Sequence, residues 1–373
     1  MAQPNILLIM TDQQRWDTIC GRTACRTPHI SALADEGVTF ERSYTPVSLC
    51  CPARAMLLSG AYGWHNGVLN QVHVPERTRW GMYDDTVTYA MRLRDAGYRT
   101  GYVGKWHAHW LKGPLDYGYG RASMPSSYGP EAMQRSNFRP DDLYAYYAHK
   151  SPIRLAAERA IRWPGGGTWP VWQEYDGSLE GRHTHAVAER GMHMLREFAE
   201  DDRPWLLEIH FPEPHDPFAP HVEFARRYDW RDISLPPTWY EEFDHKPRMN
   251  EREAATYNDL SEEDVRQAVA HYWAYNEEID YYVGRILDAL REIGQADRTL
   301  VAFTTDHGEM LGDHHMFIKG WMPYESTHRI PLVVRYPGQV GFANLLVVPP
   351  AQDDLPAVQG HNFIDRHVLE RQR

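Results

Sequence analysis

Residues that could act in catalysis or bind a metal ion follow several apolar segments of strand length. They are Asp12, Lys105, His107, His215, Asp306 and His307. In open α/β sheets, ligands bind beyond the carboxyl ends of the strands, so these side chains would meet at one edge of a sheet. Taken singly, an aspartate here can be a turn or cap residue, and a Lys or His can be a surface or packing residue. Together they predict an active site at the edge of a sheet.

A divalent cation is the cofactor that this set of donors favours. Asp12 and Asp306 would supply carboxylates, and His307 would supply a neutral ring nitrogen. Carboxylate and amide oxygens suit Ca²⁺, Mg²⁺ or Mn²⁺, and an imidazole shifts the preference towards Mn²⁺ or another transition metal. Lys105 and Lys319 are candidate positive charges for an anionic group of the substrate.

Alternating strands and helices are expected to position these residues. Strands are predicted at 5–10, 98–103, 204–211, 299–304 and 330–334. Helices are predicted at 28–36 with Thr27 as N-cap, at 86–96 with Asp85 as N-cap, at 185–200 and at 262–293, and a further helix starts at 55–58. Segments 111–180 and 221–260 read as long loops. This order predicts an α/β fold with a mostly parallel or mixed sheet in one domain.

The composition excludes some classes of protein. The 373 residues carry a formal net charge of −12, which argues against a nucleic-acid-binding protein because such proteins present a basic face. A local cationic pocket for an anionic substrate is still compatible with this charge. The apolar run at 6–10 is too short for a signal peptide, and no segment approaches the roughly 20 apolar residues of a membrane span. We therefore expect a cytoplasmic protein without membrane contact.

The four cysteines, Cys20, Cys25, Cys50 and Cys51, all lie in the first 51 residues. A secreted disulfide framework would spread its cysteines along the chain, and adjacent cysteines form a poor disulfide pair. Their spacing also lacks the paired C-x-x-C of common zinc sites. Four reduced thiols are expected before any motif is considered.

One of these cysteines lies in a recognisable motif. The segment Cys50-Cys51-Pro52-Ala53-Arg54, which leads into a predicted helix, resembles the sulfatase signature C-x-P-x-R. The spacing selects Cys50 and not Cys51. In that family the cysteine is converted to formylglycine, whose hydrated form supplies the nucleophile. The resemblance therefore implies both this modification of Cys50 and a maturation enzyme as a partner.

Further segments resemble the family in the expected order. They are 5–13, 27–30, 37–40, 97–107, 214–218 and 305–312 with 319–320. The resemblance spans about residues 4–338. It implies an alkaline phosphatase-like sandwich, in which helices flank a central, mostly parallel or mixed sheet.

The resemblance also implies roles for individual residues. The metal ligands would be Asp12, Gln13, the modified Cys50, Asp306 and His307, around one divalent ion, with Ca²⁺ ahead of Mn²⁺ or Mg²⁺. The catalytic residues would be Cys50 as nucleophile, Arg54 holding the formylglycine oxygen, Lys105 and Lys319 gripping sulfate oxygens, His215 protonating the leaving alcohol, and His107 helping to expel sulfate. The substrate would be a sulfate ester of a small molecule or a sugar.

Two positions depart from the commoner family pattern. Gln13 stands where many members have a second Asp, and His307 stands where many have Asn. Both changes, together with Ala53 in place of Ser, are similar to the branch that includes choline sulfatases and phosphonate or phosphodiester hydrolases. A phosphonate monoester or phosphodiester hydrolase that uses the same site is therefore the alternative to a sulfatase.

The end of the chain also departs from the family. Members usually continue after the segment corresponding to 335–338 with a small C-terminal subdomain, whereas residues 339–373 resemble nothing in the family. We therefore expect a catalytic domain at 1–338 and an atypical tail at 339–373. A short active member and an inactive truncated member are both compatible with this ending.

Overall fold

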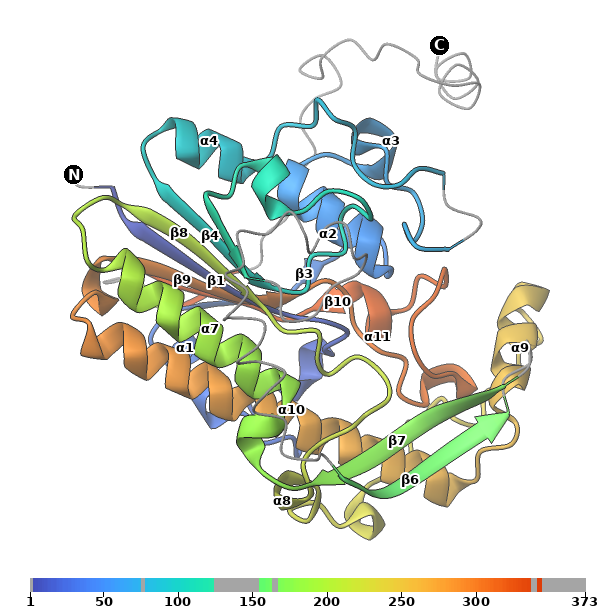
Figure 1. Cartoon of the computed structure of the whole chain (residues 1–373). Helices are drawn as coiled ribbons and strands as arrows, with labels where there is room; N and C mark the ends of the chain where they lie inside the picture. Colours follow the sequence, from blue (N-terminus) through green and yellow to red (C-terminus); the bar gives the residue numbers. More distant parts are fainter. Residues whose placement is uncertain (1–2, 75–77, 124–153, 163–166, 337–340, 344–373) are drawn as a thin grey trace, which may run out of the picture.

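The computed structural model describes residues 3–74, 78–123, 154–162, 167–336 and 341–343. Its centre is an eight-stranded sheet with the strand order β12-β2-β11-β9-β1-β8-β4-β5 (Figure 1). The strands are β1 (Asn5–Thr11), β2 (Val38–Phe40), β4 (Arg99–Gly104), β5 (Arg121–Ser123), β8 (Trp205–His210), β9 (Thr299–Thr305), β11 (Leu332–Arg335) and β12 (Gly341–Ala343). Neighbouring strands from β9 to β5 run parallel, whereas β11 is antiparallel to both β9 and β2. The mixed sheet that the sequence predicted is confirmed.

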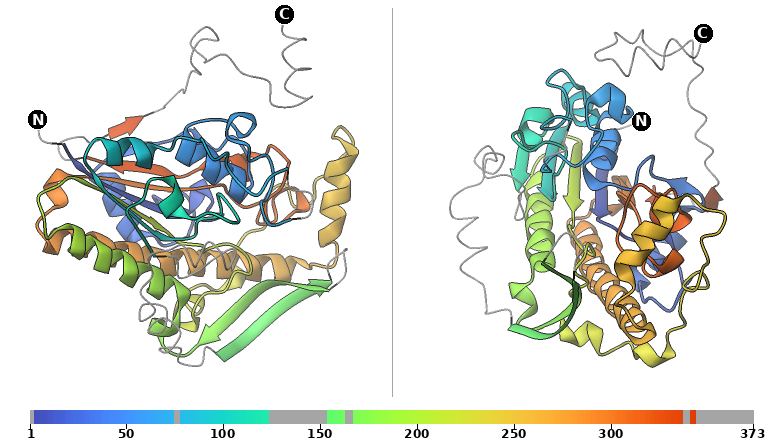
Figure 2. Two further views of the ribbon diagram at one scale, coloured as in Figure 1. Left: turned by 45° about the horizontal axis from the view of Figure 1, so that its top comes forward. Right: turned by 90° about the vertical axis from the view of Figure 1, so that its right-hand side faces the viewer.

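Helices cover both faces of the sheet (Figures 1 and 2). On one face lie α1 (Pro28–Asp35), α7 (His183–Phe198) and the long α10 (Glu262–Glu292), and on the other lie α2 (Cys50–Ser59), α3 (Gly63–Asn66) and α4 (Tyr89–Asp95). Successive strand residues point to opposite faces. Leu7 and Ile9 of β1 therefore pack in the core with α7 and α10, whereas Ile6 packs with α2 and α4. The result is a three-layer sandwich.

The register of the central strands brings their polar ends together. Thr11, the last residue of β1, pairs with Thr305, the last residue of β9. The residues that follow them, Asp12 and Asp306, consequently leave the sheet side by side. On the other side of β1, Met10 pairs with His210 at the end of β8.

Two helix starts and one strand differ from the prediction. Helix α4 begins at Tyr89 because Thr88, and not Asp85, caps it by accepting a hydrogen bond from the Met91 amide at 3.2 Å. Helix α2 begins at Cys50, earlier than the predicted start at 55–58. The strand predicted at 330–334 is divided at Pro331, which has no amide hydrogen, into β10 (Arg329–Ile330) and β11. Strand β10 pairs with β3 (Ser43–Tyr44) outside the main sheet.

The prediction of loops throughout 111–180 is wrong. An antiparallel hairpin of β6 (Arg154–Arg162) and β7 (Thr168–Asp176) extends from the sandwich, and the short helix η2 (Pro114–Tyr117) precedes β5. Part of the predicted loop, 124–153 and 163–166, lies outside the described residues. The hairpin is stabilised by contacts distant in sequence: Gln173 N donates to Phe218 O at 3.0 Å, and Phe218 N donates to Val171 O at 3.2 Å.

Short helical segments connect the remaining elements. Between 221 and 260 they are α8 (Val222–Ala225), η4 (Trp230–Asp232), α9 (Arg248–Ala254) and η5 (Ala255–Tyr257). Elsewhere they are η1 (Trp16–Thr18), η3 (Leu179–Gly181), η6 (Ala296–Arg298), η7 (Asp313–His315) and α11 (Glu325–His328). None of the helices in the described ranges has the length and apolar character needed to cross a bilayer.

Beyond the predicted domain boundary at 338, β12 pairs with β2 at the edge of the sheet. The apolar stretch at 345–348 and the rest of the tail, to 373, fall outside the residues that the structure describes.

A buried carboxylate holds α1 against α10. Thr27 lies at the N-cap of α1, but its hydroxyl donates to Thr18 O at 3.0 Å and makes no cap hydrogen bond. Asp280 of α10 instead accepts hydrogen bonds from the His29 and Ile30 amides at 3.1 and 2.8 Å. Burial raises the pKa of Asp280 to about 7, although the two amides act in the opposite direction.

We expect Asp280→Ala to lower the free energy of unfolding by about 1–3 kcal/mol, because the buried Ile30 amide and the partly buried His29 amide lose their acceptor. Asp288→Ala is the matched control on the same helix, where the Asp288 side chain is 63% exposed and pairs with Arg291. Chemical denaturation followed by circular dichroism measures both variants. Equal effects of the two substitutions would contradict this account of how α1 is anchored.

Candidate active site

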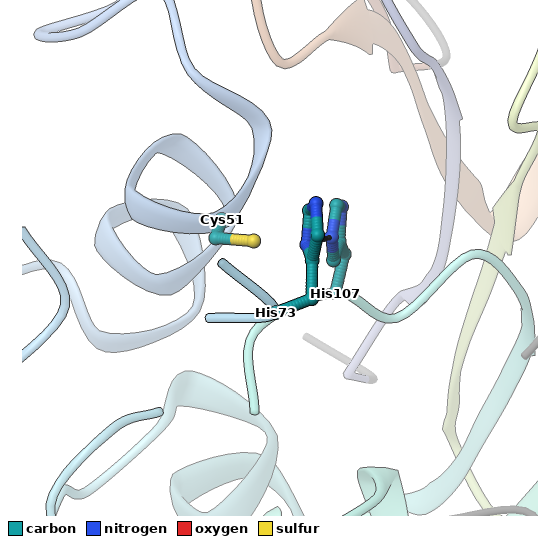
Figure 3. Close-up of side chains that lie close together, drawn as sticks. All are labelled: Cys51, His73 and His107. Carbon is teal, nitrogen blue, oxygen red and sulfur yellow. Dashed lines mark hydrogen bonds between the residues drawn. The ribbon is translucent and has the colours of Figure 1, made fainter. Parts of the chain in front are cut away.

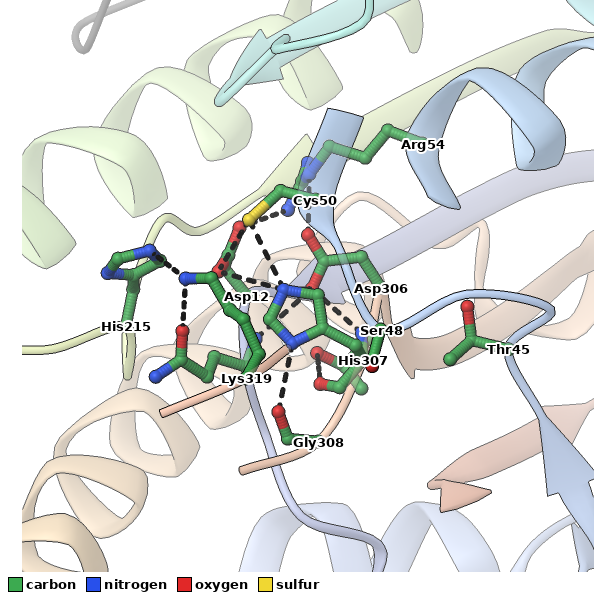
Figure 4. A network of polar contacts seen from close by, with 12 residues as sticks. Asp12, Thr45, Ser48, Cys50, Arg54, His215, Asp306, His307, Gly308 and Lys319 are labelled. Atoms are coloured by element: carbon green, nitrogen blue, oxygen red, sulfur yellow. Dashed lines mark hydrogen bonds and ion pairs between the residues drawn. The ribbon is translucent and has the colours of Figure 1, made fainter. Parts of the chain in front are cut away.

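Four side chains that could bind a metal ion converge at the carboxyl edge of the sheet. Asp12 follows β1, Asp306 and His307 follow β9, and Cys50 is the first residue of α2 (Figure 4). One ligating atom from each lies within 4.8 Å of all the others, and all four residues are buried. The structure thus brings together four of the five metal ligands predicted from the sequence, and the fifth, Gln13, lies next to them, since its backbone amide donates to Asp306 at 3.1 Å.

The orientation of His307 suits a metal ligand. Its Nδ1 lies 2.9 Å from Gly308 O. Because a carbonyl oxygen can only accept, Nδ1 carries a hydrogen and donates a hydrogen bond to it. Its Nε2 faces the cluster, 3.2 Å from Cys50 Sγ and 3.9 Å from an Asp12 oxygen. A hydrogen bond from the second ring nitrogen is the usual way in which proteins fix the tautomer of a metal-binding histidine.

The electrostatics of the cluster also suit a cation. Burial raises the pKa of Asp12, but contacts with Lys105 and Arg54 outweigh burial and hold it well below its usual range. Burial and the charge of Asp12 raise the pKa of Asp306. For His307, the neighbouring Asp306 and Cys50 outweigh burial and raise the pKa to about 9. A divalent ion would relieve the repulsion between the two carboxylates, and the donor set fits one.

The thiol of Cys50 lies in a strongly positive environment. Burial alone raises its pKa, but Lys105, Lys319 and His307 outweigh burial and place the pKa well below the usual value for a cysteine. An anion formed on the side chain at position 50 is therefore stabilised, as a nucleophile requires.

Arg54 lies behind the two carboxylates, one turn along α2 from Cys50. Its guanidinium donates to Asp306 at 2.8 Å and to Asp12 at 3.2 Å. It also donates to Thr11 O at 3.3 Å and to Lys105 O at 3.0 Å. In the structure the hydrogen bonds of Arg54 fix the two carboxylates. That Arg54 also holds the formylglycine oxygen, as the resemblance implied, stays a prediction.

Lys105 reaches the cluster from the end of β4. Its amide donates to His210 O at 2.9 Å, and its ammonium group forms a buried ion pair with Asp12. Gly104 permits this close approach because its φ is +97° and a Cβ atom would lie 1.9 Å from His210 O.

Lys319 and His215 flank Cys50 on another side (Figure 4). The Lys319 ammonium group contacts His215 Nε2 and the side-chain oxygen of Gln13. Asp216 lies 3.2 Å from His215 Nδ1 and accepts hydrogen bonds from Gln13 Nε2 at 3.0 Å and from Trp169 Nε1 at 2.9 Å. The charge of Asp216 contributes to a raised pKa of His215, although burial and Lys319 lower it. The amide of the Gln13 side chain is thus engaged by Lys319 and Asp216.

His107 approaches Cys50 from the loop after β4. Its ring stacks on His73 with centroids 4.9 Å apart, and its Nε2 lies 2.9 Å from His73 Nδ1 (Figure 3). Burial lowers the pKa of His107 to about 3, so the ring is neutral near pH 7.

The sequence interpretation missed a buried network behind Arg54. Arg54 Nη1 lies 3.1 Å from His210 Nδ1, and His210 Nε2 lies 2.9 Å from a Glu208 oxygen. The other Glu208 oxygen accepts hydrogen bonds from Tyr89 and Tyr119, the first at 2.7 Å. The sequence did contain a sign of this network. Glu208 and His210 are polar residues two positions apart in an apolar strand, so their side chains point to the same face.

Glu309 was also missed, although it lies in a segment that resembles the family. It is fully buried, and burial raises its pKa to about 7. Its carboxylate accepts hydrogen bonds from Gln13 Nε2 and from the Leu311 and Ile318 amides. Glu309 therefore connects Gln13 to the loop that carries Lys319.

Known proteins with similar sequences include sulfatases. The chain is 29% identical to an uncharacterized sulfatase, YidJ, of Escherichia coli, over 90% of this chain and 63% of the relative. It is 28% identical to a choline-sulfatase of Rhizobium meliloti, again over 90% of this chain and 63% of the relative. The chain thus spans less than two thirds of the length of these two relatives.

The fold is that of alkaline phosphatase-like sulfatases. The structure of a phosphonate monoester hydrolase from Silicibacter pomeroyi superposes with a TM-score of 0.67 at 24% identity, covering 92% of this chain and 70% of the other. The model of the sulfatase family, described as "Sulfatase", matches residues 4–342. The chain belongs to the sulfatase family.

Proposed function

We propose that this protein hydrolyses a sulfate ester of a small molecule or a sugar, with position 50 supplying the nucleophile. The observation that carries the proposal is the position of Cys50. Cys50 clusters with two carboxylates and His307, which could hold a metal ion, and the positive charges of Lys105 and Lys319 act on it. An anionic ester bound between these groups would have its reacting atom next to position 50.

Cys50 is proposed to be converted to formylglycine, whose hydrate would present a hydroxyl group for attack on the ester. His107, which hydrogen-bonds to Cys50, is proposed to help expel sulfate from position 50. Its ring is neutral near pH 7, so it can accept a hydrogen bond from a hydroxyl group at position 50.

Asp12, Asp306 and His307, with the modified residue 50 and Gln13, are proposed to hold one divalent cation, with Ca²⁺ ahead of Mn²⁺ or Mg²⁺. When bound, the ion would polarise the ester and lower the pKa of the attacking hydroxyl. Arg54 would keep the two carboxylates in position, supported from behind by His210 and Glu208.

Lys105 and Lys319 are proposed to bind the non-bridging oxygens of the ester and to stabilise the charge that develops in the transition state. His215 would protonate the leaving oxygen. Its Nδ1 contacts the backbone and side chain of Asp216, which orients the ring, while Nε2 points towards Lys319 (Figure 4).

The catalytic domain is proposed to comprise residues 1–338 and the tail residues 339–373. The family match to 342 supports a boundary near this point. Because the chain spans 63% of the two curated relatives, activity of the chain by itself is part of the proposal.

Hydrolysis of a phosphonate monoester or phosphodiester is the second candidate. Gln13 and His307 are compatible with it, since both residues are similar to the branch of the family that includes choline sulfatases and phosphonate or phosphodiester hydrolases. The same two ammonium groups would bind either tetrahedral anion.

When the protein is produced with a formylglycine-generating enzyme, we expect mass spectrometry to find the peptide that contains Cys50 lighter by about 18 Da. The mass falls because a CHO group replaces the CH₂SH group of the cysteine. Cys50→Ala should then lower turnover by at least about 10³-fold. Cys51→Ala is the control and should retain most of the turnover. Full activity of Cys50→Ala would refute the choice of nucleophile.

The effect of His215→Ala is expected to depend on the leaving group. For an alkyl sulfate, whose alkoxide needs a proton, kcat/KM should fall by about 10²–10⁴-fold. For nitrophenyl sulfate, which leaves without protonation, the fall should be much smaller. His193→Ala, at an exposed position of α7, is the control. Equal losses for both substrates would rule out general acid catalysis by His215.

The two candidate activities are distinguished by substrates with the same leaving group. We expect kcat/KM for an aryl sulfate to exceed that for the corresponding aryl phosphodiester, because a diester brings a second organic group into the site. Steady-state kinetics on the matured protein measures both values. A higher value for the phosphodiester would favour the second candidate.

A further inference from the structure

A second cluster of metal-binding side chains lies beside the proposed active site. Cys51 comes from α2, His73 from the loop after α3, and His107 from the loop after β4 (Figure 3). One ligating atom from each residue lies within 4.8 Å of the other two. We propose that these three side chains form a binding site for Zn²⁺, separate from the oxygen-rich centre at Asp12 and Asp306.

The donors select a different ion from that of the main centre. One sulfur and two imidazole nitrogens form a set that suits Zn²⁺ and is poorly suited to Ca²⁺ or Mg²⁺. Three protein ligands leave a fourth tetrahedral position for water. With bonds of roughly 2.0–2.3 Å to the ion, the ligand atoms would have to move by only about 1 Å or less.

The two histidines already face one another through their ring nitrogens. His107 Nε2 and His73 Nδ1 lie 2.9 Å apart, and the rings are nearly parallel, at 19°. A single proton can lie between two such nitrogens, so at least one lone pair points towards the partner ring. A cation held by both lone pairs would take the place of this hydrogen bond.

Cys51 is held in position to act as the third ligand. Its thiol is buried and accepts a hydrogen bond from the Val72 amide at 3.4 Å, the kind of contact that stabilises a metal-bound thiolate. Packing alone accounts for a buried thiol here, since Cys51 belongs to an apolar cluster, but it does not account for two imidazoles within reach. His73 is exposed and provides the side from which an ion enters.

The adjacent cysteines of α2 are directed to different partners. Successive residues of a helix point about 100° apart. Accordingly, Cys50 contacts His307, whereas Cys51 contacts Val72 beside His73. Zn²⁺ at Cys51 would engage His107, and would therefore inhibit the enzyme; this consequence alone rests on the proposed function.

Cobalt binding tests the site without any measurement of activity. The test uses the full chain carrying Cys50→Ala, with excess Ca²⁺ to occupy the main centre, and Co²⁺ as the probe. We expect one equivalent of Co²⁺ to give a sulfur-to-cobalt charge-transfer band in the near ultraviolet and the visible bands of tetrahedral cobalt. One equivalent of Zn²⁺ should remove both, because Zn²⁺ binds such sites more tightly than Co²⁺.

Further variants in the same background identify the ligands. His73→Ala, an exposed change that should not affect folding, is expected to weaken Co²⁺ binding by at least about tenfold. Cys51→Ala should abolish the charge-transfer band, and Cys20→Ala, the matched thiol control, should retain it. No sulfur-to-cobalt band in the folded Cys50→Ala protein, or a band that survives Cys51→Ala, would overturn the proposal.

Discussion

Two buried carboxylates that must lie side by side constrain the whole active site. Asp12 and Asp306 end adjacent parallel strands, and the strand register fixes their separation. Two neighbouring carboxylates in a buried site repel one another when both are ionised. Arg54 offsets the repulsion by donating to both carboxylates, and it is itself almost completely buried. Removing one partner of such a cluster leaves an uncompensated buried charge, so the three residues depend on one another.

Several elements contribute the groups around this cluster. Helix α2 presents position 50 at its N-terminus, and the same helix supplies Arg54 and Cys51. Strand β4 ends in Gly104 so that Lys105 can turn towards Asp12. The β6–β7 hairpin pairs with the segment after His215 and contacts Asp216 through Trp169. A hairpin far from the sheet thereby helps to orient the loop that carries His215.

Consecutive cysteines belong to two different sets of potential metal ligands that lie close together. The oxygen donors around Cys50 favour a hard divalent cation, whereas the sulfur and imidazoles around Cys51 favour Zn²⁺. His107 belongs to both environments, because it hydrogen-bonds to Cys50 and stacks on His73. A Zn²⁺ ion bound by Cys51, His73 and His107 would therefore directly change the surroundings of Cys50.

The sequence by itself determined the mixed α/β sheet, the main helices and the residues that converge at the sheet edge. It could do so because hydrophobic periodicity is local and because the ends of parallel strands must meet. The hairpin at 154–176, the cap of α4 at Thr88 and the anchoring of α1 by Asp280 were decided only by the tertiary structure. So were the contacts of Gln13 with Lys319 and of Arg54 with His210 and Glu208. The α4 cap depends on which of two nearby residues, Asp85 or Thr88, caps the helix. The other features depend on hydrogen bonds between residues far apart in the chain. Such interactions leave no periodic pattern in the sequence.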